Sequence, residues 1–107
     1  MSQLPDIKGP VEAKTEAKTR AIVTVIGEDQ VGIIAGVATI LADSGANILD
    51  ISQSIMQEFF VMIMMVDLAK AKVSFEELKT HLNAKGAAMN LKIDIQREDV
   101  FKLMHRV

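Results

Sequence analysis

An uninterrupted apolar run, Phe59 to Val66, constrains the fold of this chain more than any other segment. A strand that is apolar at every position needs cover on both faces, whereas a strand with one face in water alternates apolar and polar residues. The run is too short to cross a membrane, which takes about 20 apolar residues in a helix. We therefore expect a central strand of a sheet, covered by helices on one face and by the C-terminal tail and a second subunit on the other.

Four other segments carry the patterns of strands and of a turn. Arg20–Ile26 is rich in β-branched residues, as strands are. Ala46–Met56 is predicted as a second strand with a bulge near Asp50, because the phase of its apolar residues changes there. Gln57-Glu58 is the predicted hairpin turn into the apolar run. Met89–Gln96 alternates apolar and polar residues, which is typical of an edge strand with one face in water.

Two segments have the 3.6-residue periodicity of helices. The first follows Gly32, and Gly45 is placed to end it in a left-handed conformation. The second begins with the capping box Ser74-Phe75-Glu76-Glu77, and Gly86 is predicted to end it. The apolar positions are Ile33, Ile34, Val37, Ile40 and Leu41 in the first helix, and Phe75, Leu78 and Leu82 in the second.

The order β-α-β-β-α-β predicts an α+β, ferredoxin-like sandwich. Right-handed crossovers give a four-stranded antiparallel sheet of order 4-1-3-2 with two helices on one face. The apolar tail residues Val100, Phe101, Leu103 and Met104 predict a short C-terminal helix against the other face. Residues 1–19 hold both prolines and charges that sum to zero, so we expect a disordered arm there and a folded domain over residues 20–107.

Composition argues against several classes of partner. The 12 basic and 14 acidic residues give a net charge of −2, so there is no broad electrostatic attraction to nucleic acid or to an anionic membrane, and we expect neither as a partner. RNA-binding domains with this element order stack bases on exposed aromatic residues, whereas all four aromatic residues here are phenylalanines, which we expect in the core. The start of the chain lacks the basic and apolar regions of a signal peptide, so we expect the protein to be cytoplasmic.

No group of residues has the spacing of a catalytic or metal site. The chain has no cysteine, which removes thiolate ligands and cysteine nucleophiles. His81 and His105 lie far apart, with no carboxylate or histidine partner at helical spacing. Ser52 and Ser54 share one face of a strand, and the sequence positions no base to activate either of them. We expect no catalytic residue, no metal and no cofactor.

The segment Gly27–Ile34 joins the first strand directly to the first helix and is where we expect a small-ligand site. Asp29 is predicted as the N-cap with Gly32 at the third helical position, which leaves the amides of the helix N-terminus accessible to an anionic group. The same residues also suit a structural role, in which Asp29 caps the helix and Gly32 permits close packing. These residues alone leave both roles open.

The whole pattern resembles the ACT domain, a small module that senses amino acids and related metabolites. The matching features are the first strand, Gly-x-Asp-x-x-Gly-Ile, the apolar helix, and Gly45-Ala46-Asn47-Ile48 before the second strand. The resemblance runs from about Arg20 to Val107. It is closest to the small free-standing ACT-domain proteins of uncharacterised function in bacteria and archaea. Gln30-Val31 stands where the common ACT pattern has Arg-Pro or Lys-Pro.

The resemblance implies a non-enzymatic regulatory module in which two chains associate. A small amino acid or related metabolite would bind between the strand-to-helix loop of one chain and the start of the second strand of the other. Asp29 would orient the loop or bind the ligand's ammonium, and Asn47 would offer an amide donor and acceptor. The amides of Gln30, Val31, Gly32 and Ile33 would bind its carboxylate, and Ile34 and Ile48 would line the apolar side. The alternative is a protein-interaction subunit that regulates a partner enzyme or regulator and binds no small molecule.

Overall fold

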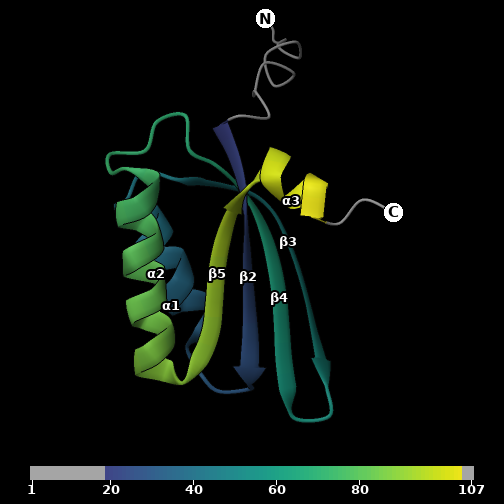
Figure 1. Cartoon of the computed structure of the whole chain (residues 1–107). Helices are drawn as coiled ribbons and strands as arrows, with labels where there is room; N and C mark the ends of the chain where they lie inside the picture. The colour runs from purple at the N-terminus through teal and green to yellow at the C-terminus, as the bar shows by residue number, and fades with distance from the viewer. Residues whose placement is uncertain (1–18, 105–107) are drawn as a thin grey trace, which may run out of the picture.

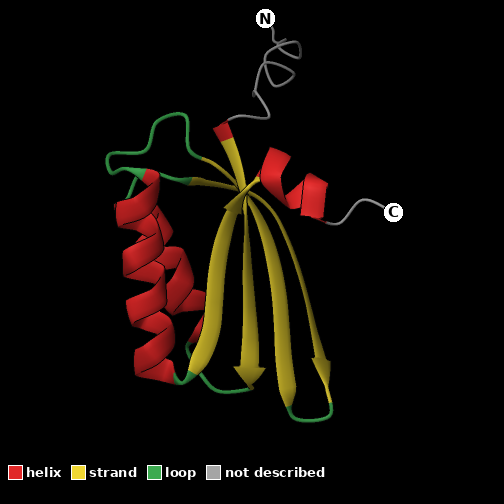
Figure 2. Cartoon of the chain, in the orientation of Figure 1, coloured by secondary structure: helices red, strands yellow, loops and turns green. Residues whose placement is uncertain are grey.

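The computed structural model describes residues 19–104, which form a four-stranded antiparallel sheet with two helices on one face and a short third helix on the other (Figure 1; Figure 2). The sheet order β3-β4-β2-β5 is the predicted order. The arm predicted over residues 1–19 lies outside the described residues except for Thr19. The elements are β2 (Arg20–Glu28), α1 (Ile33–Asp43), β3 (Asn47–Met56), β4 (Phe59–Asp67), α2 (Phe75–Met89), β5 (Leu91–Arg97) and α3 (Glu98–Met104).

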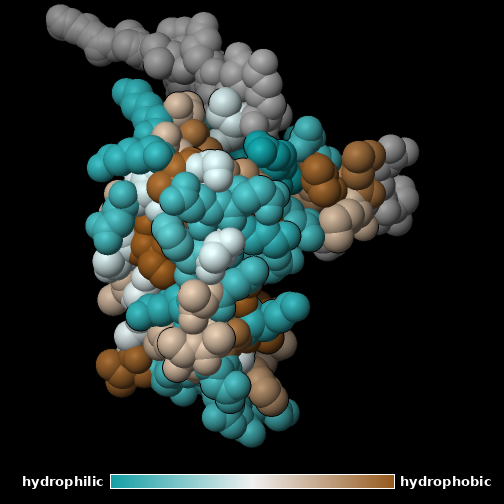
Figure 3. All heavy atoms as spheres, turned by 60° about the vertical axis from the view of Figure 1, so that its left-hand side comes forward, coloured by the Kyte–Doolittle hydropathy of each residue, from teal (hydrophilic) through white to brown (hydrophobic). Residues whose placement is uncertain are grey.

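The hydrophobic core lies between the sheet and the helices α1 and α2. Side chains alternate across the sheet, so every second residue of β2, β4 and β5 points into the core. Met62 and Met64 are fully buried in the central strand β4. The solvent side of α2 is largely hydrophilic (Figure 3). The core includes Ala21, Val23, Val25, Ile33, Val37, Leu41, Phe60, Met62, Met64, Val66, Leu78, Leu82, Leu91, Ile93 and Ile95.

The outward face of β4 is only partly covered. Phe59 is 49% exposed and Ile63 is 44% exposed, and Ile26 of β2 beside them is 48% exposed. Helix α3 packs against β2 and β5, so it protects the other half of this face. Of the cover expected from the tail and a second subunit, α3 supplies a part, over β2 and β5. Cover by a second subunit stays a prediction.

An ion pair holds α3 on the open face of the sheet. The guanidinium of Arg20 donates from Nε to Glu98 Oε1 at 2.8 Å and from Nη2 to Glu98 Oε2 at 3.1 Å. Glu98 is 5% exposed, and Lys102 Nζ lies 4.0 Å from the same carboxylate. This clasp, which we define as Arg20 and Glu98, links the first residue of β2 to the first residue of α3.

The ends of α2 confirm one predicted signal and correct another. The Ser74 hydroxyl accepts a hydrogen bond from the Glu77 amide at 3.0 Å, as the capping box predicts.

Gly86 is predicted to end the helix, but α2 continues to Met89, and Asn90, with a φ of 58°, forms the C-cap. A Cβ atom at Gly86 would lie 2.7 Å from the Leu91 carbonyl oxygen, so this glycine allows α2 to pack closely against β5. The last strand consequently begins at Leu91, not at Met89.

The predicted bulge in β3 is present. The register between β3 and β4 shifts between Ile48 and Asp50, which leaves Leu49 unpaired. After the shift, Ile51, Gln53 and Ile55 are opposite the inward-facing residues of β4 and so lie on the helix side of the sheet. Strand β3 is an edge of the sheet and is exposed from Leu49 to Met56.

Candidate ligand site

The loop between β2 and α1 is fixed to two neighbouring segments. The Asp29 amide donates to the Glu58 carbonyl at 3.0 Å, which ties the loop to the β3–β4 hairpin. The side-chain amide of Gln30 donates to the Met89 carbonyl at 2.9 Å, which ties it to the last turn of α2. The Gln30 side chain thus positions the loop.

The N-cap of α1 is Gly32, and this corrects the predicted cap at Asp29. Gly32 has a φ of 93°, no side chain caps the helix, and its first turn has no acidic residue. The first intrahelical bond runs from the Gly36 amide to the Gly32 carbonyl at 2.9 Å. The helix therefore leaves the amides from Gly32 to Ala35 without an intrahelical partner, a set that lies two residues further along than the predicted one.

The positive φ of Gly32 explains why glycine stands there. A Cβ atom at this position would meet no atom within 4 Å, so the close-packing role that the sequence allowed does not apply. A left-handed conformation is costly for residues with a side chain, whereas glycine adopts it freely. The open space beside Gly32 leaves the first turn of α1 accessible from outside.

A cavity of about 250 Å³ lies beside this helix start. Of the predicted site residues, Asp29, Gln30, Gly32, Ile33 and Ile34 line it, together with Ala35, Gln53 and Phe60. Val31 does not line it and is 98% exposed. Asp29 and the residues of the helix N-terminus line one cavity, and a negative residue beside a partial positive charge suits a zwitterion better than a plain anion.

Sequence reasoning missed Gln53 and Phe60. Gln53 is the polar residue between Ile51 and Ile55 on the face of β3 that points toward the helices. A polar residue in an otherwise apolar series could have indicated a role in a site. Gln53 lies beside the loop because of the register between β3 and β4. The sequence does not determine that register to better than one residue at a bulge. Ile34, an apolar position of α1 that was also predicted to line the site, lines this cavity and is 39% exposed.

Asn47 and Ile48 lie at the other end of the sheet within one chain. Asn47 is opposite Asp67, which is opposite Arg20, whereas the loop follows Glu28 at the far end of the same strand. The ten residues of β3 span about 30 Å at 3.3 Å per residue. Asn47 lines a separate depression with Gly45, Asp67, Ala69 and Lys70. A single chain therefore does not bring the two halves of the predicted site together.

The other residues considered from sequence lie apart from this cavity. His81 is exposed on α2, and Ser52 and Ser54 are exposed on β3. His105 lies outside the described residues. Within residues 19–104, no three histidine, aspartate or glutamate side chains are grouped so as to hold a metal ion. In the same range, no helix has the length and hydrophobicity needed to span a membrane.

Comparison with known proteins identifies the family. Residues 19–96 match the ACT domain family model. A UPF0237 protein from Clostridium acetobutylicum is 57% identical over 88 residues, which are 82% of this chain and 99% of the relative. A UPF0237 protein from Methanocaldococcus jannaschii is 49% identical over 89 residues, which are 83% of this chain and 99% of the relative.

A solved structure agrees with these matches. The structure of an ACT domain protein from Streptococcus pneumoniae is similar to this one with a TM-score of 0.68 at 41% sequence identity, and the match covers 78% of this chain and 93% of that chain. The range that matches the family model includes the β2–α1 loop and the whole sheet except its last residue. The chain therefore belongs to the ACT domain family, among the bacterial and archaeal proteins that carry the UPF0237 name.

Proposed function

We propose that this protein is a non-enzymatic regulatory module that binds a small amino acid or a related metabolite at a homodimer interface. ACT domains generally bind amino acids for regulation and commonly form dimers. The observation that carries the proposal is the cavity at the start of α1, where the uncapped amides and the Asp29 carboxylate line one space. The amides would bind the ligand's carboxylate, Asp29 its ammonium, and Ile33, Ile34 and Phe60 its apolar part.

The exposed edge strand β3 supports a specific arrangement of the two chains. Edge strands present unpaired amides and carbonyls, and a two-fold axis pairs one β3 with a second β3 in the antiparallel direction. This pairing would bring the partner's Asn47 and the partner's Ile48 toward the β3–β4 hairpin, to which the Asp29 amide is bonded. The two ends of the site that lie apart in one chain would then meet across the interface.

We expect the protein to form a homodimer that buries at least ~1,000 Å² in total. Changing Ser52 and Ser54 together to lysine is expected to give a monomer, because charged side chains on an edge strand oppose pairing with another strand. Changing both to threonine preserves the polar hydroxyls without a charge and is expected to leave the dimer intact. Sedimentation velocity measures the oligomeric state of the parent and the two variants. A monomeric parent at tens of micromolar would contradict the proposed interface.

A thermal-shift screen against the twenty amino acids tests the ligand. A ligand at ~100 times its dissociation constant adds ~2.7 kcal/mol to the free energy of unfolding. Asn47→Ala is expected to weaken binding by about 1 to 3 kcal/mol, because a buried polar group of the ligand loses its hydrogen bond. Asn83→Ala, on the exposed side of α2, is the control and is expected to bind as the parent does. Titration calorimetry that returns one affinity for all three proteins would exclude Asn47 from the site.

One observation favours the second candidate, a protein-interaction subunit without a small-molecule ligand. Ile26, Phe59 and Ile63 are half-exposed on the outward face of the sheet, where a partner protein would find apolar contacts. Adjacent apolar side chains of this kind mark surfaces for other proteins. A dimer whose stability responds to none of the amino acids would favour this candidate over ligand sensing.

A further inference from the structure

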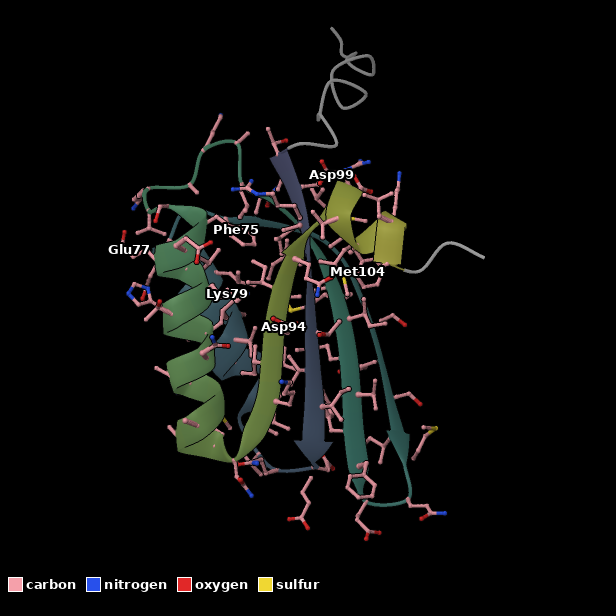
Figure 4. All side chains as sticks on the ribbon, viewed as in Figure 1. Phe75, Glu77, Lys79, Asp94, Asp99 and Met104 are labelled. Atoms are coloured by element: carbon pink, nitrogen blue, oxygen red, sulfur yellow. The ribbon has the colours of Figure 1, made fainter. Side chains whose placement is uncertain are left out.

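A second cavity lies under α3, on the opposite face of the sheet from the loop cavity. It has a volume of about 250 Å³ and shares no lining residue with the site at the start of α1. Asp94 lines it from β5 and Met104 from α3, and both are labelled in Figure 4. The full lining is Ile22, Thr24, Asp94, Gln96, Phe101 and Met104.

The four sheet residues of this cavity form two neighbouring cross-strand pairs. Thr24 is opposite Asp94, and Ile22 is opposite Gln96, so all four project from the same face. Directly opposite side chains have Cβ atoms about 5 Å apart, close enough to contact one small ligand together. The sheet therefore supplies a hydroxyl, a carboxylate and an amide. Ile22, which is 6% exposed, forms an apolar wall with Phe101 and Met104.

The polar groups of the cavity have unused capacity to accept hydrogen bonds. Gln96 Oε1 is buried and has no hydrogen-bond partner. Asp94 Oδ1 accepts from the Ile95 amide at 3.0 Å, and among residues 19–104 no cation forms an ion pair with this carboxylate. Buried acceptors almost always have a hydrogen-bond partner in native proteins, so we expect a ligand in this cavity to donate hydrogen bonds. The arrangement of a carboxylate, an amide oxygen and a hydroxyl around an apolar wall matches a donor with a positive charge.

We propose that this cavity binds small primary ammonium ions that carry a short apolar chain. An ammonium group has three N–H donors and no acceptor, which matches Gln96 Oε1, the Asp94 carboxylate and the Thr24 hydroxyl. The apolar chain would contact Ile22, Phe101 and Met104. The volume is several times that of one water molecule, which occupies about 30 Å³ in the liquid, so a ligand of about five non-hydrogen atoms fits. This site is independent of the proposed amino-acid site.

Titration of the full chain with n-butylammonium chloride, followed by amide NMR spectra, tests the proposal. We expect saturable shifts at Thr24, Gln96 and Phe101. Sodium butyrate and n-butanol at the same ionic strength have apolar chains of matching size and are expected to produce no saturable shift at these residues. Asp94→Asn preserves the shape of the side chain and removes its charge, and it is expected to weaken butylammonium binding about tenfold or more.

Two further variants separate this site from the loop cavity. Gln96→Leu is expected to lose binding and to unfold at the same or a higher temperature than the parent, because it removes an unsatisfied acceptor. Gln53→Leu alters the loop cavity and is expected to leave butylammonium binding unchanged. Equal shifts with butyrate, unchanged affinity of Asp94→Asn, shifts confined to the loop around Asp29, or no saturation at all would each overturn the proposal. The amino-acid screen on the parent reports on the loop site separately.

Discussion

Replacing Gly32 by aspartate is expected to weaken ligand binding at the α1 start by about a hundredfold or more, because two like charges brought together cost several kcal/mol. The new carboxylate would stand beside the first-turn amides that we assign to the ligand's carboxylate. A Cβ atom at Gly32 meets no atom within 4 Å, so the added side chain has space and the fold is retained. Titration calorimetry with an amino acid found in the thermal-shift screen measures the loss.

Gly32→Asn is the matched control for this prediction. Asparagine and aspartate have nearly the same shape, and both must adopt the φ of 93° found at Gly32. Each is expected to lower the free energy of unfolding by about 1 to 2 kcal/mol through this backbone strain. Only aspartate adds a charge, so asparagine is expected to retain most of the binding. Equal affinities of the two variants would remove the amides of α1 from the site while leaving the family assignment intact.

Replacing Glu98 by alanine is expected to lower the free energy of unfolding by about 2 to 4 kcal/mol, because it leaves a partly buried cation without its partner. The Glu98 side chain is 6% exposed and the Arg20 side chain is 30% exposed. The exposure of Arg20 places the expected loss below that of a fully buried pair. Urea denaturation of the parent and the variant measures the difference.

The neighbouring residue provides the control for the clasp. Asp99 also lies in the first turn of α3, but it is exposed, and its carboxylate accepts from the Val100 amide at 2.8 Å. Asp99→Ala is expected to cost less than about 1 kcal/mol, because an exposed local hydrogen bond adds little stability. Changing Arg20 to methionine together with Glu98 to leucine is expected to recover much of the loss, because the charge that then lacks its partner, on Lys102, is exposed to water. If Glu98→Ala and Asp99→Ala unfold at the same urea concentration, the clasp adds no stability.

Periodicity predicted the fold because each strand and helix carries its pattern within a few consecutive residues. The order of these elements and right-handed crossovers predicted the strand order, and the apolar run of β4 agrees with its central place. Gly86 was misinterpreted because glycine both ends helices and permits close approach, and the sequence does not distinguish the two. A Cβ atom at Gly86 would lie 2.7 Å from the Leu91 carbonyl oxygen, and this close approach is seen only once α2 is packed on β5.

The site was predicted less completely than the fold because contacts between distant residues define it. The loop and most of its lining residues follow from a local strand-to-helix junction. The cap at Gly32 depends on a positive φ. The loop before it is held by the bond from Asp29 to Glu58, a residue of the β3–β4 hairpin. Gln53 and Phe60 enter through strand register, and Gln30 is fixed by a carbonyl 59 residues away in the sequence.

The two hydrogen bonds of the β2–α1 loop also determine how the loop can move. Opening the loop breaks the bond from Asp29 to the hairpin and the bond from Gln30 to the end of α2, so we expect the loop, the hairpin turn and the last turn of α2 to open together. A molecule that holds the loop closed reduces local unfolding in all three segments, including two that it need not contact. If the proposed ligand binds the loop, we therefore expect its occupancy to reach the hairpin turn and the end of α2 through reduced local opening, without any change in the average structure.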